Sequence, residues 1–114
     1  MDSKLIKLVK ELKTASKKNE APIWLKIAKN ALKSNSNKKS VNLEKIDKLT
    51  NDGNAIVVSG KILGTGKLSH SVLVSSFSIS NSAAKKIKES GGQIFQFSDM
   101  IKKFPSGKGV KIIG

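Results

Sequence analysis

The spacing of the apolar residues changes near the middle of the chain, and this change limits the folds that the sequence can adopt. Up to residue 49 the apolar side chains recur every three or four positions, which is typical of amphipathic helices. From residue 54 they come in short runs rich in Val and Ile, separated by Gly, Ser and Asn, which is typical of strands. This order predicts an α/β fold in which helices come first and strands alternate with short helices afterwards.

The first segments predict two helices. Residues 4–18 carry Leu and Val at helical spacing, and Ser3 is a candidate N-cap. Residues 22–33 form the clearest amphipathic segment, in which Pro22 suits a first helical turn. Trp24 lies near the middle of the apolar face of this segment, so we expect it in the core rather than in a base-stacking site.

A polar and basic stretch, residues 34–40, predicts an exposed loop after these helices. Asn42 can cap a third, short helix that ends near Gly53. The length of 114 residues suits a single domain, with a helical part over residues 1–40 and an α/β core over residues 41–114.

The second half predicts the order β-β-α-β-α-β. We expect strands at 54–60, 71–79, 93–97 and 109–114, and helices at 80–92 and 98–105, the first of them capped by Ser80 or Ser82. Four phenylalanines in this half are expected to be core residues: Phe77, Phe95, Phe97 and Phe104.

The stretch 58–72 places glycines and lysines between two apolar runs, as phosphate-binding loops do. A P-loop would require Gly at position 61 and Ser or Thr at position 68, where the chain has Lys61 and Leu68. A dinucleotide-binding fingerprint would require Gly at position 69, which is Ser69, and a helix where the sequence predicts a strand. Both nucleotide-binding motifs are therefore excluded.

Two interpretations of this stretch remain. Its glycines could simply supply turn positions in a long β-hairpin. In addition, they could let a polynucleotide backbone approach while Lys61 and Lys67 neutralise its phosphates. We favour the second, because 22 basic against 8 acidic residues give a net charge of +14, which predicts a polyanionic partner. All the basic residues are lysines, which favours contacts to phosphates over contacts to base edges.

Other kinds of site find little support. His70 is the single histidine, there is no cysteine, and no nucleophile elbow surrounds Ser69 or Ser71, so we expect neither a catalytic site nor a metal or cofactor. No apolar run reaches the ~20 residues of a membrane span, and no signal peptide is evident. A basic module for anionic membranes is a weak alternative, because the lysines are spread over all segments.

Five short segments, APIW, VSGKILGTGKL, FSISNSAAKKI, GGQIFQFSDM and PSGKGVKIIG, together resemble the archaeal L-eighteen-e family of large-subunit ribosomal proteins. The bacterial ribosomal protein L-fifteen is the distant counterpart of this family. The resemblance runs from about Leu5 to Gly114. It implies N-terminal helices followed by an irregular β-β-α superhelical α/β domain. It also implies a non-catalytic role in the large subunit of the cytoplasmic ribosome, bound to 23S-type rRNA.

The family's glycine element falls on Gly60, Lys61, Leu63, Gly64, Gly66 and Leu68. Its basic segment before the third helix falls on Lys38 and Lys39, where archaeal members often carry arginines and this chain has the thinner SNSNKKS.

We therefore expect a structural protein that stabilises folded rRNA by neutralising its phosphates. The candidate phosphate contacts are Lys38, Lys39, Lys61, Lys67, Lys108 and Lys111. The glycines expected to allow close backbone approach are Gly64, Gly66, Gly107 and Gly109, and secondary candidates are Ser69 and His70. The expected partners are 23S-type rRNA and neighbouring large-subunit proteins, but no membrane, small-molecule substrate or second copy of the chain. The alternative is a free-standing nucleic-acid-binding module, such as an RNA chaperone or a DNA-compacting protein.

Overall fold

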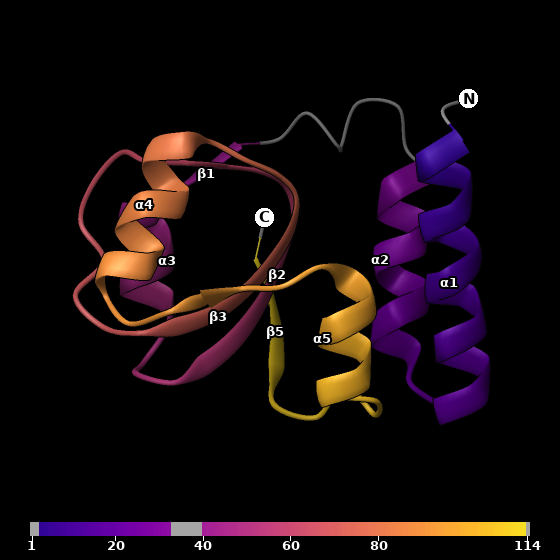
Figure 1. The fold of residues 1–114 in the computed structure, drawn as a ribbon. Coiled ribbons are helices and arrows are strands. Elements are labelled where there is room, and N and C mark those ends of the chain that lie inside the picture. The colour runs from indigo at the N-terminus through magenta and orange to yellow at the C-terminus, as the bar shows by residue number, and fades with distance from the viewer. Residues whose placement is uncertain (1–2, 33–39, 114) are drawn as a thin grey trace.

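The computed structural model describes residues 3–32 and 40–113, so the candidates Lys38 and Lys39 lie outside the described residues. The elements follow in the order α1 (Ser3–Asn19), α2 (Pro22–Leu32), β1 (Ser40–Asn42), α3 (Leu43–Leu49), β2 (Asn54–Leu63), β3 (Val72–Ile79), α4 (Asn81–Glu89), β4 (Gln93–Ile94), α5 (Phe97–Lys103) and β5 (Val110–Ile113) (Figure 1). The predicted α/β class, with helices first, is confirmed.

All the strand pairs of the described sheet are parallel, and β2 lies at its centre. On one side β2 pairs with β3, which in turn pairs with β4. On its other side β2 pairs with two strands, because β1 lies beside its end (Ser40 opposite Lys61) and β5 beside its beginning (Val110 opposite Ala55). Parallel strands need connections that return along the sheet. Three of these connections contain α3, α4 and α5, and the fourth is residues 64–71, which we call the return segment.

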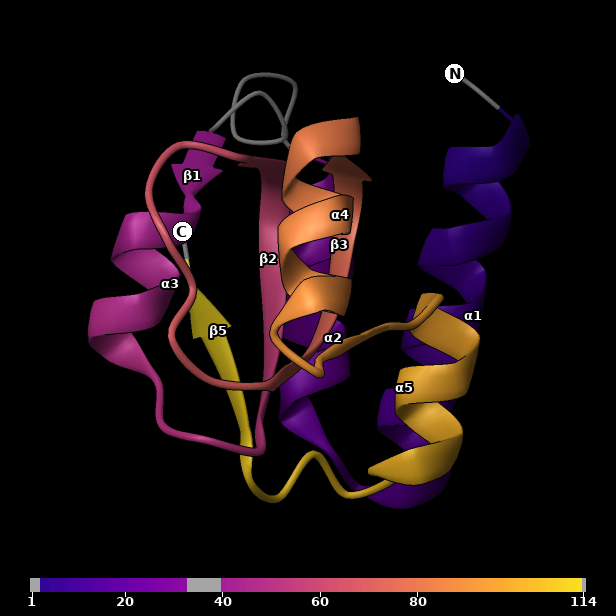
Figure 2. The same ribbon diagram turned by 60° about the vertical axis from the view of Figure 1, so that its left-hand side comes forward.

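The hairpin considered between the two long strands is wrong. β3 runs parallel to β2, and Val72 at the start of β3 lies opposite Asn54 at the start of β2. The chain must therefore travel back along β2, and the return segment does so without a helix (Figure 2). Two smaller differences accompany this one: β1 was not predicted, and Phe97, expected in a strand, begins α5.

Helices cover both faces of the sheet, with α1, α2 and α5 on one side and α3, α4 and the return segment on the other (Figures 1 and 2). Side chains alternate between these faces along each strand. Ala55 and Val57 of β2 pack with α1, α2 and α5, whereas Ile56 and Val58 pack with α3 and α4. Two apolar clusters, one on each face, thus hold the layers together by burial of apolar surface.

Trp24 is fully buried in the cluster formed by α1, α2 and α5, as its place on the helix predicts. Its indole Nε1 donates a hydrogen bond of 2.9 Å to the carbonyl of Pro105, which ties α2 to the chain just after α5. The phenylalanines join the same cluster: Phe97 is buried, and the other three are half-buried against it. No aromatic platform for stacked bases is formed by these side chains in the described part of the chain.

Two predicted helix caps are confirmed. The Asn42 side chain accepts a hydrogen bond of 3.0 Å from the backbone N–H of Lys45, at the start of α3. The Ser80 hydroxyl accepts one of 3.2 Å from Ala83 N–H, at the start of α4. Each cap satisfies a backbone donor that the first helical turn leaves unpaired. Both helices that border the return segment are therefore anchored at their starts.

Replacement of Gly66 by alanine should destabilise the fold by about 2 to 4 kcal/mol. Gly66 has φ +92°, and an added Cβ would lie 2.7 Å from the Cβ of Glu44, so strain and overpacking add together. Gly53 provides a matched control, since it has φ +82° but open space around a Cβ; Gly53→Ala should cost about 1 kcal/mol. Urea unfolding of both variants measures the difference, and equal losses would show that the packing of the return segment on α3 is unimportant.

Candidate nucleic-acid interface

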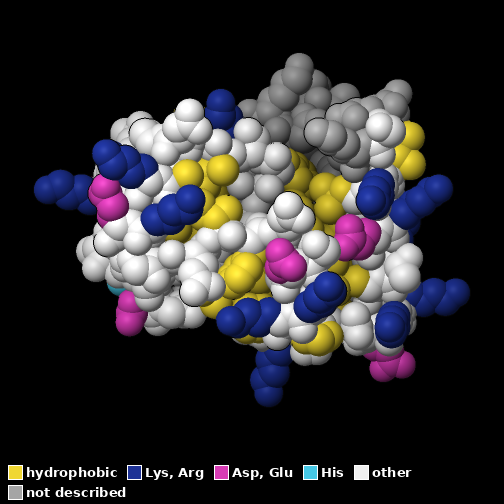
Figure 3. Space-filling view, viewed as in Figure 1, with side chains coloured by type: hydrophobic (Ala, Val, Ile, Leu, Met, Phe, Trp, Pro, Cys, Tyr) yellow, Lys and Arg dark blue, Asp and Glu magenta, His cyan; other side chains and the backbone are white. Residues whose placement is uncertain are grey.

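Lysine side chains surround the molecule and are nearly all exposed. Of the 18 lysines whose side chains the structure describes, 17 are exposed, and Lys86 alone is half-buried. Figure 3 shows lysines at several separate places on one face and along parts of its edge, with apolar side chains between them. Two lysines of the described residues form ion pairs with glutamates, Lys48 with Glu44 (3.2 Å) and Lys85 with Glu89 (4.0 Å). Both pairs are exposed and contribute little to stability, so most of the positive charge is available to a partner.

The four predicted contact lysines that are described are all exposed, but they do not form one tight cluster. Lys61 lies in β2, and Lys111 lies in β5 opposite Ile56, so five residues, about 16 Å, separate them along the sheet. Lys67 lies in the return segment, and Lys108 precedes β5. The Lys111 ammonium also donates to the carbonyl of Leu49 (3.4 Å). A partner that touches all four must be extended over several parts of the surface.

The structure gives three of the four candidate glycines an internal role. A Cβ at Gly64 would collide with Ser82 of α4, one at Gly66 would press on α3, and one at Gly107 would collide with a side chain of α2. Gly109 alone has open space around it, with φ +84°. Close approach of the chain to itself therefore accounts for Gly64, Gly66 and Gly107. Close approach of RNA stays a prediction for all four.

Ser69 and His70 are held by the residues of α3 and its end. The carboxylate of Asp47 accepts hydrogen bonds from the Ser69 N–H (2.8 Å) and hydroxyl (2.6 Å). The Thr50 hydroxyl donates to the carbonyl of Ile46 (2.6 Å), so it accepts its 2.7 Å hydrogen bond from Nε2 of His70. The polar atoms of both candidates are thus engaged in fastening the return segment to α3.

A second carboxylate fastens the end of the return segment in the same way. Asp52 accepts hydrogen bonds from the Ser71 N–H (2.9 Å) and hydroxyl (2.8 Å). In an extended chain, residues two apart point in the same direction, so Ser69 and Ser71 both face the region that carries Asp47 and Asp52. The hydrogen bonds from Ser69 hold the pKa of Asp47 below its ordinary value of 3.8, and those from Ser71 lower the pKa of Asp52 likewise.

Lys86 fastens the beginning of the return segment from the side of α4. Its ammonium donates hydrogen bonds to the carbonyls of Gly64 (2.6 Å) and Gly66 (3.0 Å). The carbonyl between them, that of Thr65, accepts a hydrogen bond of 3.2 Å from the N–H of Glu44. Sequence reasoning did not single out Lys86 among the lysines of α4. The available signal was its position three residues after the buried Ala83, at the edge of the helix face that packs on the sheet.

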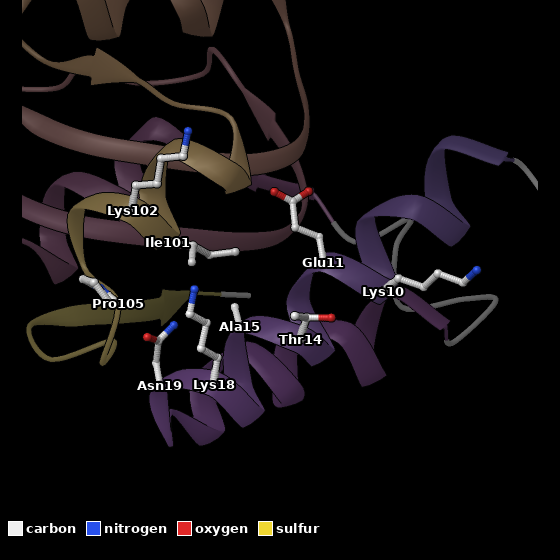
Figure 4. A pocket seen from close by; sticks show the side chains of 9 residues that line it. All are labelled: Lys10, Glu11, Thr14, Ala15, Lys18, Asn19, Ile101, Lys102 and Pro105. Carbon is white, nitrogen blue, oxygen red and sulfur yellow. The ribbon is translucent and has the colours of Figure 1, made fainter.

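A groove between α1 and α5 was also not predicted. It measures about 460 Å³ and is lined by Lys10, Glu11, Thr14, Ala15, Lys18, Asn19, Ile101, Lys102 and Pro105 (Figure 4). Its floor is apolar and its rim carries mostly positive charge. In Figure 4 the Lys18 side chain rises along the groove toward Ile101, whereas that of Lys10 extends away from it.

Two other kinds of site are absent from residues 3–32 and 40–113. No three His, Asp or Glu side chains gather there in a way that could hold a metal ion. None of the described helices has both the length and the apolar character needed to cross a membrane.

Comparison with known proteins identifies relatives over nearly the whole chain. The sequence model of a family of ribosomal proteins, described as comprising 50S-L15, 50S-L18e and their 60S counterpart, matches residues 4–95. The chain is 37% identical to a protein of Archaeoglobus fulgidus over 109 residues. This alignment covers 96% of this chain and 93% of the relative. It is 39% identical over 110 residues to a protein of Methanoregula boonei, in an alignment that covers 96% of this chain and 91% of the relative. It is 33% identical over 112 residues to a protein of Pyrobaculum aerophilum, in an alignment that covers 98% of this chain and 92% of the relative. All three relatives are named "Large ribosomal subunit protein eL18".

The two fastening carboxylates should make stability depend on pH in the acid range. Their pKa values are lower in the folded chain than the ordinary 3.8, so their stabilising effect is complete above that pH and is lost as the pH falls below it, through the folded-state values. The free energy of unfolding should therefore fall on acidification below about pH 4, and less steeply in an Asp47→Asn, Asp52→Asn double variant.

Urea unfolding between about pH 6 and about pH 2 measures this dependence. Asp99→Asn is the matched control, because Asp99 lies in the first turn of α5, on the other side of the sheet. An acid dependence that is the same in the double variant and in the unchanged chain would contradict the assigned role of Asp47 and Asp52.

Proposed function

Because the chain belongs to the family of ribosomal proteins that comprises 50S-L15, 50S-L18e and their 60S counterpart, we propose that it is a structural component of the large ribosomal subunit in the cytoplasm. There it binds 23S-type rRNA and stabilises the folded RNA by neutralising phosphates where RNA segments meet. The family consists of ribosomal proteins, so the prediction that the chain is not an enzyme is confirmed.

The observation that carries this proposal is the combination of the relatives' names with the exposed charge. The net charge is +14, and nearly every described lysine extends into solvent. Each lysine that meets a phosphate releases condensed counterions from the RNA, which favours binding at moderate ionic strength. Because lysine is a compact point charge without the planar fork of arginine, the protein recognises the path of the RNA backbone more than its sequence.

Six lysines are the proposed phosphate contacts: Lys38, Lys39, Lys61, Lys67, Lys108 and Lys111. Lys61 and Lys111 lie apart along the sheet, and Lys67 lies in the return segment between α3 and α4. This spread fits an RNA that covers several parts of the surface. Neighbouring proteins of the large subunit are the further proposed partners, in line with the names of the relatives.

Binding of purified 23S-type rRNA should weaken steeply with salt. If about six phosphates are neutralised, the logarithm of the binding constant should fall against the logarithm of the salt concentration with a slope of about −4 to −5. Filter binding or fluorescence titration over a range of salt concentrations measures this slope. A flat salt response would contradict phosphate neutralisation.

Replacing Lys61 and Lys67 by methionine should lower the steepness of that slope by about 1.5 to 2, because two phosphate contacts are lost. A Lys13→Met, Lys17→Met variant removes the same charge from exposed positions of α1 and should change the slope much less. Both variants should keep the stability of the unchanged chain. Equal slopes for the two variants would remove Lys61 and Lys67 from the interface.

Sedimentation with large subunits in high salt separates the proposal from its alternative. A subunit component stays bound, whereas a free-standing RNA chaperone or DNA-compacting protein dissociates and binds any polyanion.

A further inference from the structure

The groove of about 460 Å³ lies where the short helix α5 packs beside the long helix α1 (Figure 4). α5 has 7 residues and α1 has 17, so at 1.5 Å per residue α5 is about 10 Å long and α1 about 25 Å. α5 therefore covers only part of the flank of α1. The small side chain of Ala15, which lines the groove, does little to fill the remaining space.

The floor of the groove is aliphatic. Ala15 is 7% exposed and belongs to the apolar cluster that α1, α2 and α5 share, and Ile101 is half-buried against the same cluster. Pro105 lines the groove beside them. None of the nine described residues that line it carries an aromatic ring or a guanidinium plane, on which a nucleobase would stack. The floor therefore suits an aliphatic side chain better than a base.

Charges of both signs lie on the rim of the groove. Lys18 of α1, Lys102 of α5 and Glu11 of α1 line it and are exposed. In Figure 4 the two lysines lie toward Pro105, and Glu11 lies toward the opposite end. Within residues 3–32 and 40–113, none of these three side chains forms an ion pair. An RNA backbone carries only negative charge and would be repelled by Glu11, whereas a protein segment can carry groups that complement both signs.

From this arrangement we propose that the groove is a docking site for a segment of a neighbouring large-subunit protein. The segment places an aliphatic side chain against Ala15 and Ile101, carboxylates near Lys18 and Lys102, and a basic group near Glu11. Burial of the aliphatic side chain favours binding, and the rim charges fix the direction in which the segment lies. The inference rests on the proposed function and deepens it, because it gives the protein partner a surface distinct from the lysines proposed for RNA.

A single thiol in the groove tests which molecule occupies it. The chain has no cysteine, so Thr14→Cys introduces one at an exposed position that lines the groove, and a benzophenone maleimide can be attached there. In assembled large subunits, illumination should join the chain to another subunit protein, at a segment where an aliphatic residue lies near acidic ones. Lys17→Cys is the matched control, since it lies on α1 at an exposed position outside the groove, and it should not give this product.

Three results of the cross-linking would overturn the inference: attachment to rRNA, attachment to a second copy of this chain, or no product from Thr14→Cys in subunits that contain the chain.

Charge variants test the rim. A synthetic peptide with the sequence of the cross-linked segment should bind the unchanged chain, and Lys18→Gln with Lys102→Gln should weaken this binding about fivefold, because two ion pairs are lost. Lys13→Gln with Lys17→Gln removes the same charge from exposed positions outside the groove and should weaken it less than about twofold. Glu11→Gln should also weaken peptide binding, by about twofold.

Fluorescence titration at one salt concentration measures these affinities. Equal losses in the two lysine double variants, or tighter peptide binding to Glu11→Gln than to the unchanged chain, would also overturn the inference. The two proposals fail differently. If the unchanged chain neither binds rRNA in a salt-dependent way nor stays with large subunits, the proposed function fails. If it does both while the groove variants behave like their controls, only the docking site is removed.

Discussion

The parallel pairing of β2 with β3 is the constraint on which the remaining structure depends. Because the two strands point the same way, the chain between them must cross back along the sheet, and here it does so in eight residues without a helix. A segment of this kind has no internal ladder of hydrogen bonds and must obtain them from its neighbours. Asp47 of α3, Asp52 just after α3 and Lys86 of α4 supply hydrogen bonds to it, in place of those that a helix forms within itself.

The features that the sequence could predict are those decided by neighbours along the chain. The caps Asn42 and Ser80 and the place of Trp24 depend on residues within one or two helical turns, and the structure confirms them. The direction of β3 depends instead on contacts between distant residues, such as Asp47 with Ser69, and glycines at 64 and 66 suit a hairpin as well as a return. The three-residue strand β1 exists only through its pairing with β2, so no local pattern could reveal it.

The same distinction applies to the candidate site. Exposure of the lysines followed from their charge, and the four described candidates are exposed as expected. The glycines, Ser69 and His70 are predicted contacts because they lie next to the lysines in the sequence, and the structure gives most of them internal partners. A glycine allows close approach equally to RNA and to another part of the chain, so the sequence cannot distinguish the two. Only the structure shows that α4 and α3 lie against Gly64 and Gly66. The sequence did not indicate the role of Lys86, because it lies between other lysines of α4 and only the structure shows that it is half-buried while Lys85 and Lys88 are exposed.

The hydrogen bond between Trp24 and Pro105 joins residues 81 positions apart, and β5 pairs with the central strand from the same late region. During synthesis, α1 and α2 are made long before Pro105 and β5 exist. Until residues 105–113 have been synthesised, the Trp24 indole lacks its hydrogen-bond acceptor, and the beginning of β2 lacks β5, its partner strand on that side. Both apolar clusters can therefore be completed only when the last residues of the chain have been synthesised. A chain that ended before this region would leave both clusters partly exposed to solvent.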